Sequence, residues 1–284
     1  MSKVFPRTEV AGVSLSRMLI GTNWMLGWSH QTPAADARIK ETFDKPEDFF
    51  PQLNAYLSYG IDSLMGPIAA EPKMKAAIDY AQEKTGKKII TIDTPSINVH
   101  DSAEARREAE ATIKKCAKDG ATFCLIHHSS AEELVNKNKR EITRIDDYTK
   151  MIRDAGMIPG LSAHMPELIT FSDNNGYDVE TYIQIFNCMG FLMQIEIETI
   201  ASIIHGAKKP VMTIKPMAAG RVTPYVGLTF NWNALRKQDM ITVGCFTERE
   251  VHEDVEISFA ALEGRFPELE KRASPNNNQA AFGN

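Results

Sequence analysis

Eight short apolar segments recur along this chain of 284 residues, and charged, amphipathic stretches separate them. This alternation is typical of repeated βα units, in which parallel strands are buried on both faces by the helices that connect them. The intervening stretches include helical patterns at 103–119 and 146–155. The apolar segments lie at residues 17–22, 60–65, 88–93, 121–127, 157–162, 182–187, 211–215 and 240–244.

Eight strand–helix units in a chain of this length predict an α/β fold, a single (β/α)8 TIM barrel. A doubly wound sheet is the alternative architecture, and the lack of a Gly-x-Gly-x-x-Gly motif after the first apolar segment disfavours it. We assign residues 1–273 to the barrel domain. Residues 274–284 are polar and rich in Asn, which predicts a C-terminal tail, either flexible or folded back as a strap.

Composition restricts the partners and the compartment. A net charge of -5 with dispersed basic residues disfavours nucleic acid as a partner. No apolar run approaches the roughly 18 residues that span a bilayer, and the N-terminus lacks signal-peptide features. The four cysteines are widely separated and form no Cys-x-x-Cys pair, which suits a reducing compartment. We therefore expect a cytoplasmic protein that acts on a small molecule, without a membrane partner, as a monomer or a homo-oligomer.

Polar residues end most of the predicted strands, and in a (β/α)8 barrel these ends converge on one mouth. Asp93 ends the third segment, His127 and His128 end the fourth, and His164 follows the fifth. Two chemistries fit these residue types. Asp93, His127 and His164 would form a two-histidine, one-carboxylate site for a divalent metal. The same side chains would otherwise act as general acid and base.

Lys215 ends the apolar run Val-Met-Thr-Ile-Lys, where an ammonium group is costly unless it reaches the mouth or a partner. A lowered pKa there would make it a Schiff-base nucleophile or a base. Pairing with a neighbouring carboxylate, or contact with a bound anion, is the alternative. We include Lys215 with His127, Asp93 and His164 among the candidate catalytic residues.

Other mouth residues suggest binding roles. Aromatic side chains in the loop after the first segment would stack on a substrate, or would plug the mouth. Gly244 and Thr247 lead into the last helix, whose first backbone N–H groups would bind phosphate; Thr247 and Glu250 also match a capping box. The candidate substrate-binding residues are Asn23, Trp24, Trp28, His128 and Asn187.

Several segments together resemble the aldo/keto reductase superfamily, over residues 5–262. Residues 10–17 are similar to its N-terminal hairpin, residues 60–62 to the entry of its second strand, and residues 124–127 to the strand that carries its active-site histidine. Residues 160–164, 215–221 and 243–255 are similar to later motifs. The resemblance implies a TIM barrel with an N-terminal hairpin. It also implies that a nicotinamide cofactor would be held by Ser162, Gln184, Gly244 and Thr247.

The sequence departs from that family at the catalytic positions. Of the family's Asp, Tyr, Lys and His, only the histidine is matched, by His127. Met65, Ala70 and Ile92 stand at the other three positions, and alanine cannot replace a tyrosine proton donor. Ala163 replaces an expected asparagine. Ordinary carbonyl reduction is therefore disfavoured.

Three functions follow from these observations. The leading one is a non-redox lyase, isomerase or hydrolase that acts on a small carbohydrate or keto acid through a His/Asp cluster, with or without a divalent metal. The second is an NAD(P)-dependent oxidoreductase with an atypical proton donor. The third is a non-catalytic binding protein on the same fold, since fold alone does not determine function.

Overall fold

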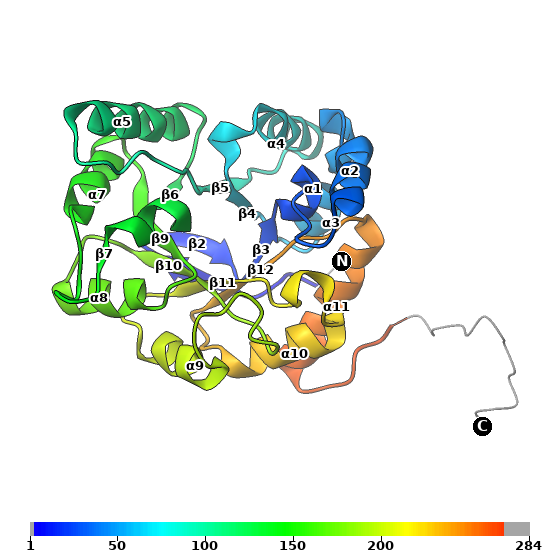
Figure 1. The fold of residues 1–284 in the computed structure, drawn as a ribbon. Helices are drawn as coiled ribbons and strands as arrows, with labels where there is room; N and C mark the ends of the chain where they lie inside the picture. Colours follow the sequence, from blue (N-terminus) through cyan, green and yellow to red (C-terminus); the bar gives the residue numbers. More distant parts are fainter. Residues whose placement is uncertain (1–2, 270–284) are drawn as a thin grey trace, which may run out of the picture.

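The eight apolar segments form eight parallel strands that close into a barrel, and each strand pairs with the next one along the sequence. The computed structural model describes residues 3–269, and its helices surround the strands (Figure 1). The predicted (β/α)8 barrel is thus confirmed. The barrel strands are β3 (Met18–Gly21), β4 (Ser63–Gly66), β5 (Ile90–Asp93), β6 (Phe123–Ile126), β9 (Ile158–Ala163), β10 (Thr181–Ile185), β11 (Val211–Ile214) and β12 (Met240–Val243).

An antiparallel hairpin precedes the barrel, as the family resemblance implies. It consists of β1 (Arg7–Val10) and β2 (Val13–Ser16), and both residues of its tight turn, Ala11 and Gly12, have positive φ angles. Val10 and Leu15 pack into the apolar cluster that fills the inside of the barrel. The hairpin therefore closes the amino-terminal end of the strands.

The helices pack one apolar face against the outside of the barrel. In α5, residues 105, 109, 113 and 116 are buried, which is the spacing of one helix face, and Ser102 caps its first turn. The capping box predicted at Thr247 and Glu250 is present at the start of α11. The α-helices are α1 (Asn23–Leu26), α2 (Pro33–Thr42), α3 (Phe50–Ser58), α4 (Pro72–Thr85), α5 (Ala103–Lys118), α6 (His128–Ala131), α7 (Ile145–Asp154), α8 (Glu167–Asn175), α9 (Ile197–Gly206), α10 (Pro224–Ala234) and α11 (Glu248–Glu263).

Short elements complete the connections. Four 3-10 turns lie at Pro46–Phe49, Ile68–Ala70, Glu132–Leu134 and Ala218–Gly220, and a small hairpin joins β7 (Val135–Asn136) to β8 (Glu141–Ile142). The proposed C-terminal tail, residues 274–284, lies outside the described residues. None of the helices formed by residues 3–269 is long and apolar enough to cross a membrane.

Strand residues alternate between two apolar clusters. One cluster lies inside the barrel and includes Leu19, Met65, Ile92 and Ile183; the other lies between the strands and the helices. Because successive strand residues point to opposite faces, the neighbours of these inward residues face the surrounding helices. This alternation decides which strand-end side chains reach the mouth of the barrel.

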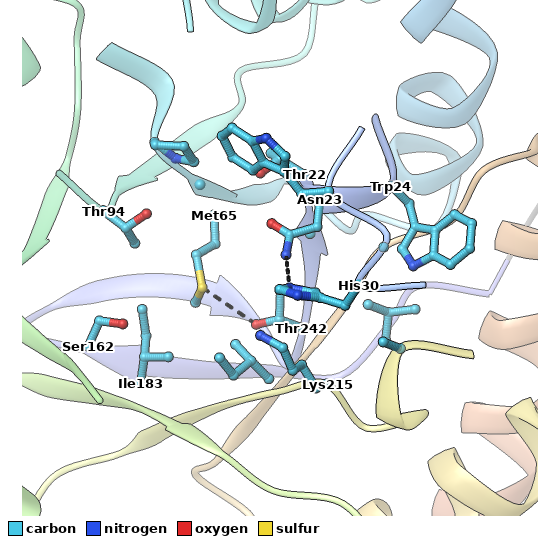
Figure 2. Close-up of a pocket in the computed structure, with 18 of the residues that line it drawn as sticks. Thr22, Asn23, Trp24, His30, Met65, Thr94, Ser162, Ile183, Lys215 and Thr242 are labelled. Atoms are coloured by element: carbon cyan, nitrogen blue, oxygen red, sulfur yellow. Dashed lines mark hydrogen bonds between the residues drawn. The ribbon is translucent and has the colours of Figure 1, made fainter. Parts of the chain in front are cut away.

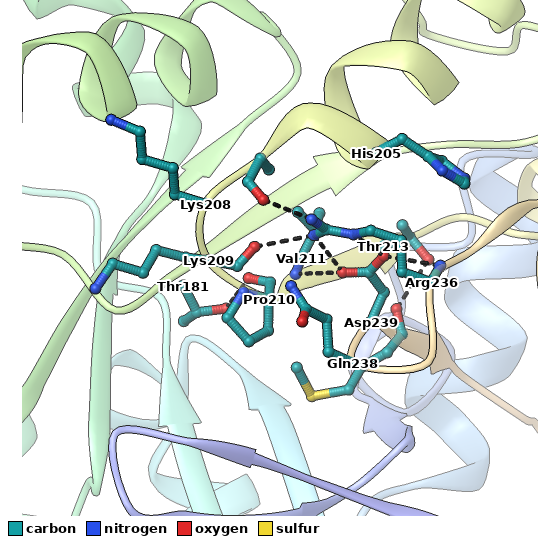
Figure 3. Close-up of polar contacts among 12 residues, drawn as sticks. Thr181, His205, Lys208, Lys209, Pro210, Val211, Thr213, Arg236, Gln238 and Asp239 are labelled. Carbon is teal, nitrogen blue, oxygen red and sulfur yellow. Dashed lines mark hydrogen bonds and ion pairs between the residues drawn. The ribbon is translucent and has the colours of Figure 1, made fainter.

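A buried ion pair fastens the amino-terminal ends of β11 and β12 (Figure 3). The fully buried Asp239 carboxylate accepts hydrogen bonds from Nε and Nη2 of Arg236 and from the backbone N–H of Val211. Arg236 also donates to the carbonyl oxygen of Lys209. A charged pair of this kind is tolerated inside a protein because both charged groups are hydrogen-bonded to partners.

Candidate active site

A cavity of about 430 Å³ lies at the carboxyl-terminal ends of the barrel strands. Figure 2 shows part of its lining, including polar residues from β3, β9, β11 and β12 and the loops after them. This is where the (β/α)8 fold places its binding residues. The predicted site residues that line the cavity are Asn23, Trp24, Trp28, His127, His128, Ser162, His164, Lys215 and Gly244.

Three histidines form a row on one side of the cavity. The His127 and His128 rings are 4.1 Å apart between centroids, and the His128 ring stacks on the His164 ring at 4.0 Å. His127 and His128 follow β6, and His164 follows the neighbouring strand β9. Adjacent strands therefore bring these imidazoles together, as the sequence predicted.

Hydrogen bonds assign the proton of the His127 ring. The backbone N–H of Ser129 donates to Nδ1 of His127, and the hydroxyl groups of Ser129 and Ser96 lie 2.8 and 3.3 Å from the same atom. A backbone N–H can only donate, so Nδ1 is the acceptor and the neutral ring carries its hydrogen on Nε2. No described residue hydrogen-bonds to Nε2, which leaves this N–H free to donate to a ligand.

All three imidazoles are neutral near pH 7. Burial, together with the neighbouring His128 and Lys215 charges, lowers the pKa of His127 to about 4 and that of His164 to about 3. Burial also lowers the pKa of His128. Glu132 holds the loop after β9, because its carboxylate accepts from the backbone N–H groups of His164 and Met165.

Lys215 reaches the cavity from the end of β11. Its backbone is left-handed, with φ of 59°, and Ala218 and Ala219 in the same loop are also left-handed. In the described part of the chain, its ammonium group forms no hydrogen bond or ion pair. Burial lowers the pKa of Lys215 to about 8. The carboxylate partner considered in the sequence analysis is thus absent from residues 3–269.

His30 also lines the cavity, although it does not follow a strand end as the predicted site residues of this kind do. Its Nε2 lies 3.3 Å from Nδ2 of Asn23, and Figure 2 shows the Lys215 side chain directed toward the same region. Burial, followed by the Lys215 charge, lowers the pKa of His30. The sequence signal for His30 was weak, because it lies in an irregular loop rather than at a strand end.

Two loops on this side of the mouth are tied together. Arg221 donates to the carbonyl oxygen of His30, and its guanidinium lies 4.0 Å from the centre of the Phe191 ring. The Gln31 side chain donates to the carbonyl oxygen of Ala219. The loop after β3 and the loop after β11 therefore hold His30 and Lys215 on the same wall of the cavity.

Asp93 does not join the histidines, which corrects the predicted metal and catalytic cluster. Its neighbour Ile92 points into the barrel, so Asp93 points outward, where its carboxylate accepts from the backbone N–H of Ala69. Burial raises the pKa of Asp93 to about 6. Within residues 3–269 no group of three His, Cys, Asp or Glu side chains is arranged to hold a metal.

Gln184 is turned away from the cavity for the same reason. Ile183 points inward, and the Gln184 amide donates to the carbonyl oxygens of His164 and Ile185. The position predicted to contact a nicotinamide ring therefore presents Ile183 to the cavity. Gln184 instead helps to fix the backbone of the loop that carries His164.

Asn187 and Thr247 do not line the cavity either. The Asn187 side chain closes its own loop by accepting from the backbone N–H groups of Met189 and Phe191. Thr247 caps α11, and the Glu250 carboxylate accepts from the backbone N–H groups of Phe246 and Thr247. A carboxylate thus already occupies the helix start that would have bound phosphate.

The ionisable side chains in the described lining of the cavity are all basic. Its described lining contains Lys215 and four imidazoles but no aspartate or glutamate. Two carboxylates outside the lining, Glu132 and Asp36, act on the pKa values of His128 and His30. Within the lining, an anion would meet N–H donors and an ammonium group, which stabilise it. The arrangement suits a ligand with a carboxylate, an enolate or another oxyanion.

Comparisons with known proteins agree on the fold. No family model and no curated protein matches this chain. An aldo-keto reductase from Pseudomonas aeruginosa matches with a TM-score of 0.65 at 13% identity, over 92% of this chain and 97% of that one. An aldo-keto reductase from Klebsiella pneumoniae, in complex with NADPH, matches with a TM-score of 0.59 at 14% identity, over 94% and 92%.

A ribulose-1,5-bisphosphate carboxylase/oxygenase (Rubisco) from Pyrococcus horikoshii also matches, with a TM-score of 0.52 at 13% identity over 78% of this chain and 57% of that one. At such low identities, structural similarity establishes the fold and not the reaction. The chain has the (β/α)8 barrel fold of the aldo-keto reductases.

Proposed function

We propose that this protein is a non-redox enzyme that transfers a proton next to the carbonyl group of a small anionic compound, with 2-oxo acids as the leading substrate class. One observation carries the proposal: the cavity holds an unpaired lysine and four imidazoles without any described carboxylate in its lining. Isomerases and lyases that act on keto acids share such a proton-transfer step.

The charge of the site supports an anionic substrate. A buried ammonium group without a partner is costly, and a bound carboxylate would offset that cost. The same carboxylate would raise the pKa values of the nearby histidines, because a negative charge stabilises the imidazolium form. Substrate binding would thus turn the weakly basic imidazoles into effective proton acceptors.

Roles follow from the hydrogen bonds. The free Nε2–H of His127 would donate to the carbonyl oxygen, where negative charge develops as the neighbouring carbon loses its proton. The imidazole of His164 makes no hydrogen bond to a described residue and would accept that proton. Lys215 would stabilise the enolate oxygen or react with the carbonyl group itself.

Deuterium exchange tests the proposal without knowledge of the natural substrate. Pyruvate, 2-oxobutyrate, glycolaldehyde and dihydroxyacetone would each be incubated with the protein in D₂O, and loss of the proton signal next to the carbonyl would be followed by NMR. We expect the two keto acids to exchange at least about 100-fold faster with the native protein than with the Lys215→Met variant. The exposed Lys237 provides the matched control, Lys237→Met, which should exchange at the native rate. Exchange at the buffer rate for all four compounds would overturn the proposal.

The nicotinamide cofactor implied by the fold fits this site poorly. Ser162 and Gly244 line the cavity. Gln184, however, faces away from it, and the Glu250 carboxylate holds the N–H groups at the start of α11. A cofactor phosphate at that helix start would meet a like charge. We therefore assign no step to a nicotinamide.

Titration of the purified protein with NADPH and NADH, followed by nicotinamide fluorescence, checks this conclusion. We expect no saturable binding up to millimolar cofactor, because the contacts predicted for Gln184 and Thr247 are not available. Saturation at micromolar cofactor, lost in a Gly244→Leu variant that fills the cavity wall, would restore the oxidoreductase hypothesis and remove the basis for a non-redox reaction.

A further inference from the structure

We propose that Lys215 reacts covalently with its substrate, forming an imine between its Nζ and the carbonyl carbon of a 2-oxo acid or a small aldehyde. The inference rests on the proposed function, since it concerns the same cavity, and it specifies how that cavity would activate a carbonyl compound.

The environment of the amine is the first observation. Among the lysines of residues 3–269, Lys215 alone is partly buried and yet forms no hydrogen bond or ion pair; Lys75 and Lys209, also partly buried, pair with Asp79 and Glu180. Burial lowers the Lys215 pKa to about 8, so about a tenth of the amine is neutral at pH 7, against well under a hundredth for an ordinary lysine. Only the neutral amine has the electron pair that attacks a carbonyl carbon.

The backbone gives the second observation. A left-handed conformation costs a non-glycine residue about 1–2 kcal/mol, and Lys215 adopts it at the point where β11 ends. The tie between Gln31 and Ala219 and the contact of Arg221 with His30 hold this loop in place. These contacts hold the loop backbone in the conformation in which Lys215 lines the cavity.

The neighbouring groups supply the third observation. His30, His127, His128 and His164 line the same cavity as Lys215, and the Lys215 charge lowers the pKa of each of them. A carboxylate beside the lysine would keep the amine protonated, and no described lining residue carries one. Arg221, which donates to the carbonyl oxygen of His30, adds a second positive charge near that ring and lowers the pKa of His30.

Imine formation proceeds through a carbinolamine. The Nζ electron pair forms a bond to the carbonyl carbon while the C=O π electrons move to oxygen, which takes up a proton. The nitrogen loses a proton to solvent or to an imidazole, giving the carbinolamine. The hydroxyl group of the carbinolamine then takes up a second proton from solvent, the C–O bond breaks as water leaves, and the nitrogen electron pair forms the C=N bond of the protonated imine. The His127 Nε2–H, which no described residue accepts, would hydrogen-bond to this oxygen until water leaves.

Once protonated, the imine nitrogen withdraws electrons from the adjacent carbon more strongly than a carbonyl oxygen does. Loss of a proton from that carbon to His164 would give a neutral enamine, with no oxyanion to stabilise. This explains why a site built for carbonyl chemistry can lack both a metal-binding carboxylate and a tyrosine acid.

Reductive trapping tests the inference. The native protein, Lys215→Arg, Lys215→Met and Lys237→Arg would be incubated with each of the four carbonyl compounds and sodium cyanoborohydride, and the adduct would be measured by intact mass and mapped by peptide mass spectrometry. We expect one adduct per chain at Lys215, formed at least about tenfold faster than at any other lysine. The adduct should be unchanged in Lys237→Arg and absent in both Lys215 variants. Its rate should rise with pH and level off above about pH 8, because the neutral amine is the reacting form.

Deuterium exchange and reductive trapping together distinguish a failure of the imine from a failure of the proposed function. Deuterium exchange without an adduct at position 215 would overturn the imine and leave proton transfer standing, with Lys215 acting through its charge. An adduct without exchange would support the imine and overturn the proposed reaction. An adduct spread evenly over exposed lysines, or none with any of the four compounds, would overturn the imine.

Discussion

Replacing His127 by alanine should slow deuterium exchange of keto acids by about 10²–10⁴-fold, the range expected when a positioned proton donor is lost. The free Nε2–H is the group removed, and Ser129 and Ser96 hold the ring from its other side. Because His127 also caps the short helix α6, we expect a loss of about 1 kcal/mol in the free energy of unfolding. NMR exchange rates and urea unfolding measure the two effects separately.

Two variants make this prediction specific. His100 is exposed and does not line the cavity, so His100→Ala should exchange at the native rate. Ser129→Ala keeps the imidazole but removes a hydroxyl partner of Nδ1, and should lower the rate by about tenfold through looser positioning. A native rate in His127→Ala, with the fold intact, would remove this residue from the reaction.

Replacing Asp239 by alanine should destabilise the protein by about 3–5 kcal/mol, because the change leaves the Arg236 guanidinium buried without its charge partner. The carboxylate also accepts from the backbone of Val211, so the first residue of β11 loses a hydrogen bond. Unfolding in guanidinium chloride, followed by circular dichroism, gives the free energy. The rate of deuterium exchange per folded molecule should stay unchanged, since this cluster lies at the opposite end of the barrel from the cavity.

An exposed ion pair provides the comparison. Lys150 and Asp154 pair across one turn of α7 with both side chains largely in solvent, and Asp154→Ala should change the stability by no more than about 0.5 kcal/mol. Equal effects of the two substitutions would show that burial does not determine the contribution of Asp239.

Most of the fold could be predicted because its signal repeats. Each of the eight buried strands coincides with an apolar run in the sequence, and the predicted ends differ from the observed ones by at most three residues. The largest difference is at β4, which begins at Ser63 rather than Gly60. Gly60 has a φ of 70° and belongs to the turn that ends α3, so the apolar run there contains a turn as well as a strand.

The site was predicted less completely, and strand alternation explains the errors. His127, His164 and Lys215 follow strand ends and reach the cavity, whereas Asp93 and Gln184 lie within strands, where a shift of one residue reverses the direction of a side chain. The sequence predicted correctly that Asp93 and Gln184 lie in barrel strands, but it did not show whether their side chains face the inside or the outside of the barrel. His30 depends on a loop conformation that no periodic pattern encodes.

The N-terminal hairpin determines from which end of the barrel a molecule can reach the cavity. Val10 and Leu15 seal one end, and the packed interior of the barrel leaves no passage along its axis. Every molecule that reaches Lys215 must therefore enter and leave by the same opening. In a reaction with two substrates or two products, a compound covered by a second one in the cavity would have to arrive first and depart last, which gives an ordered kinetic sequence.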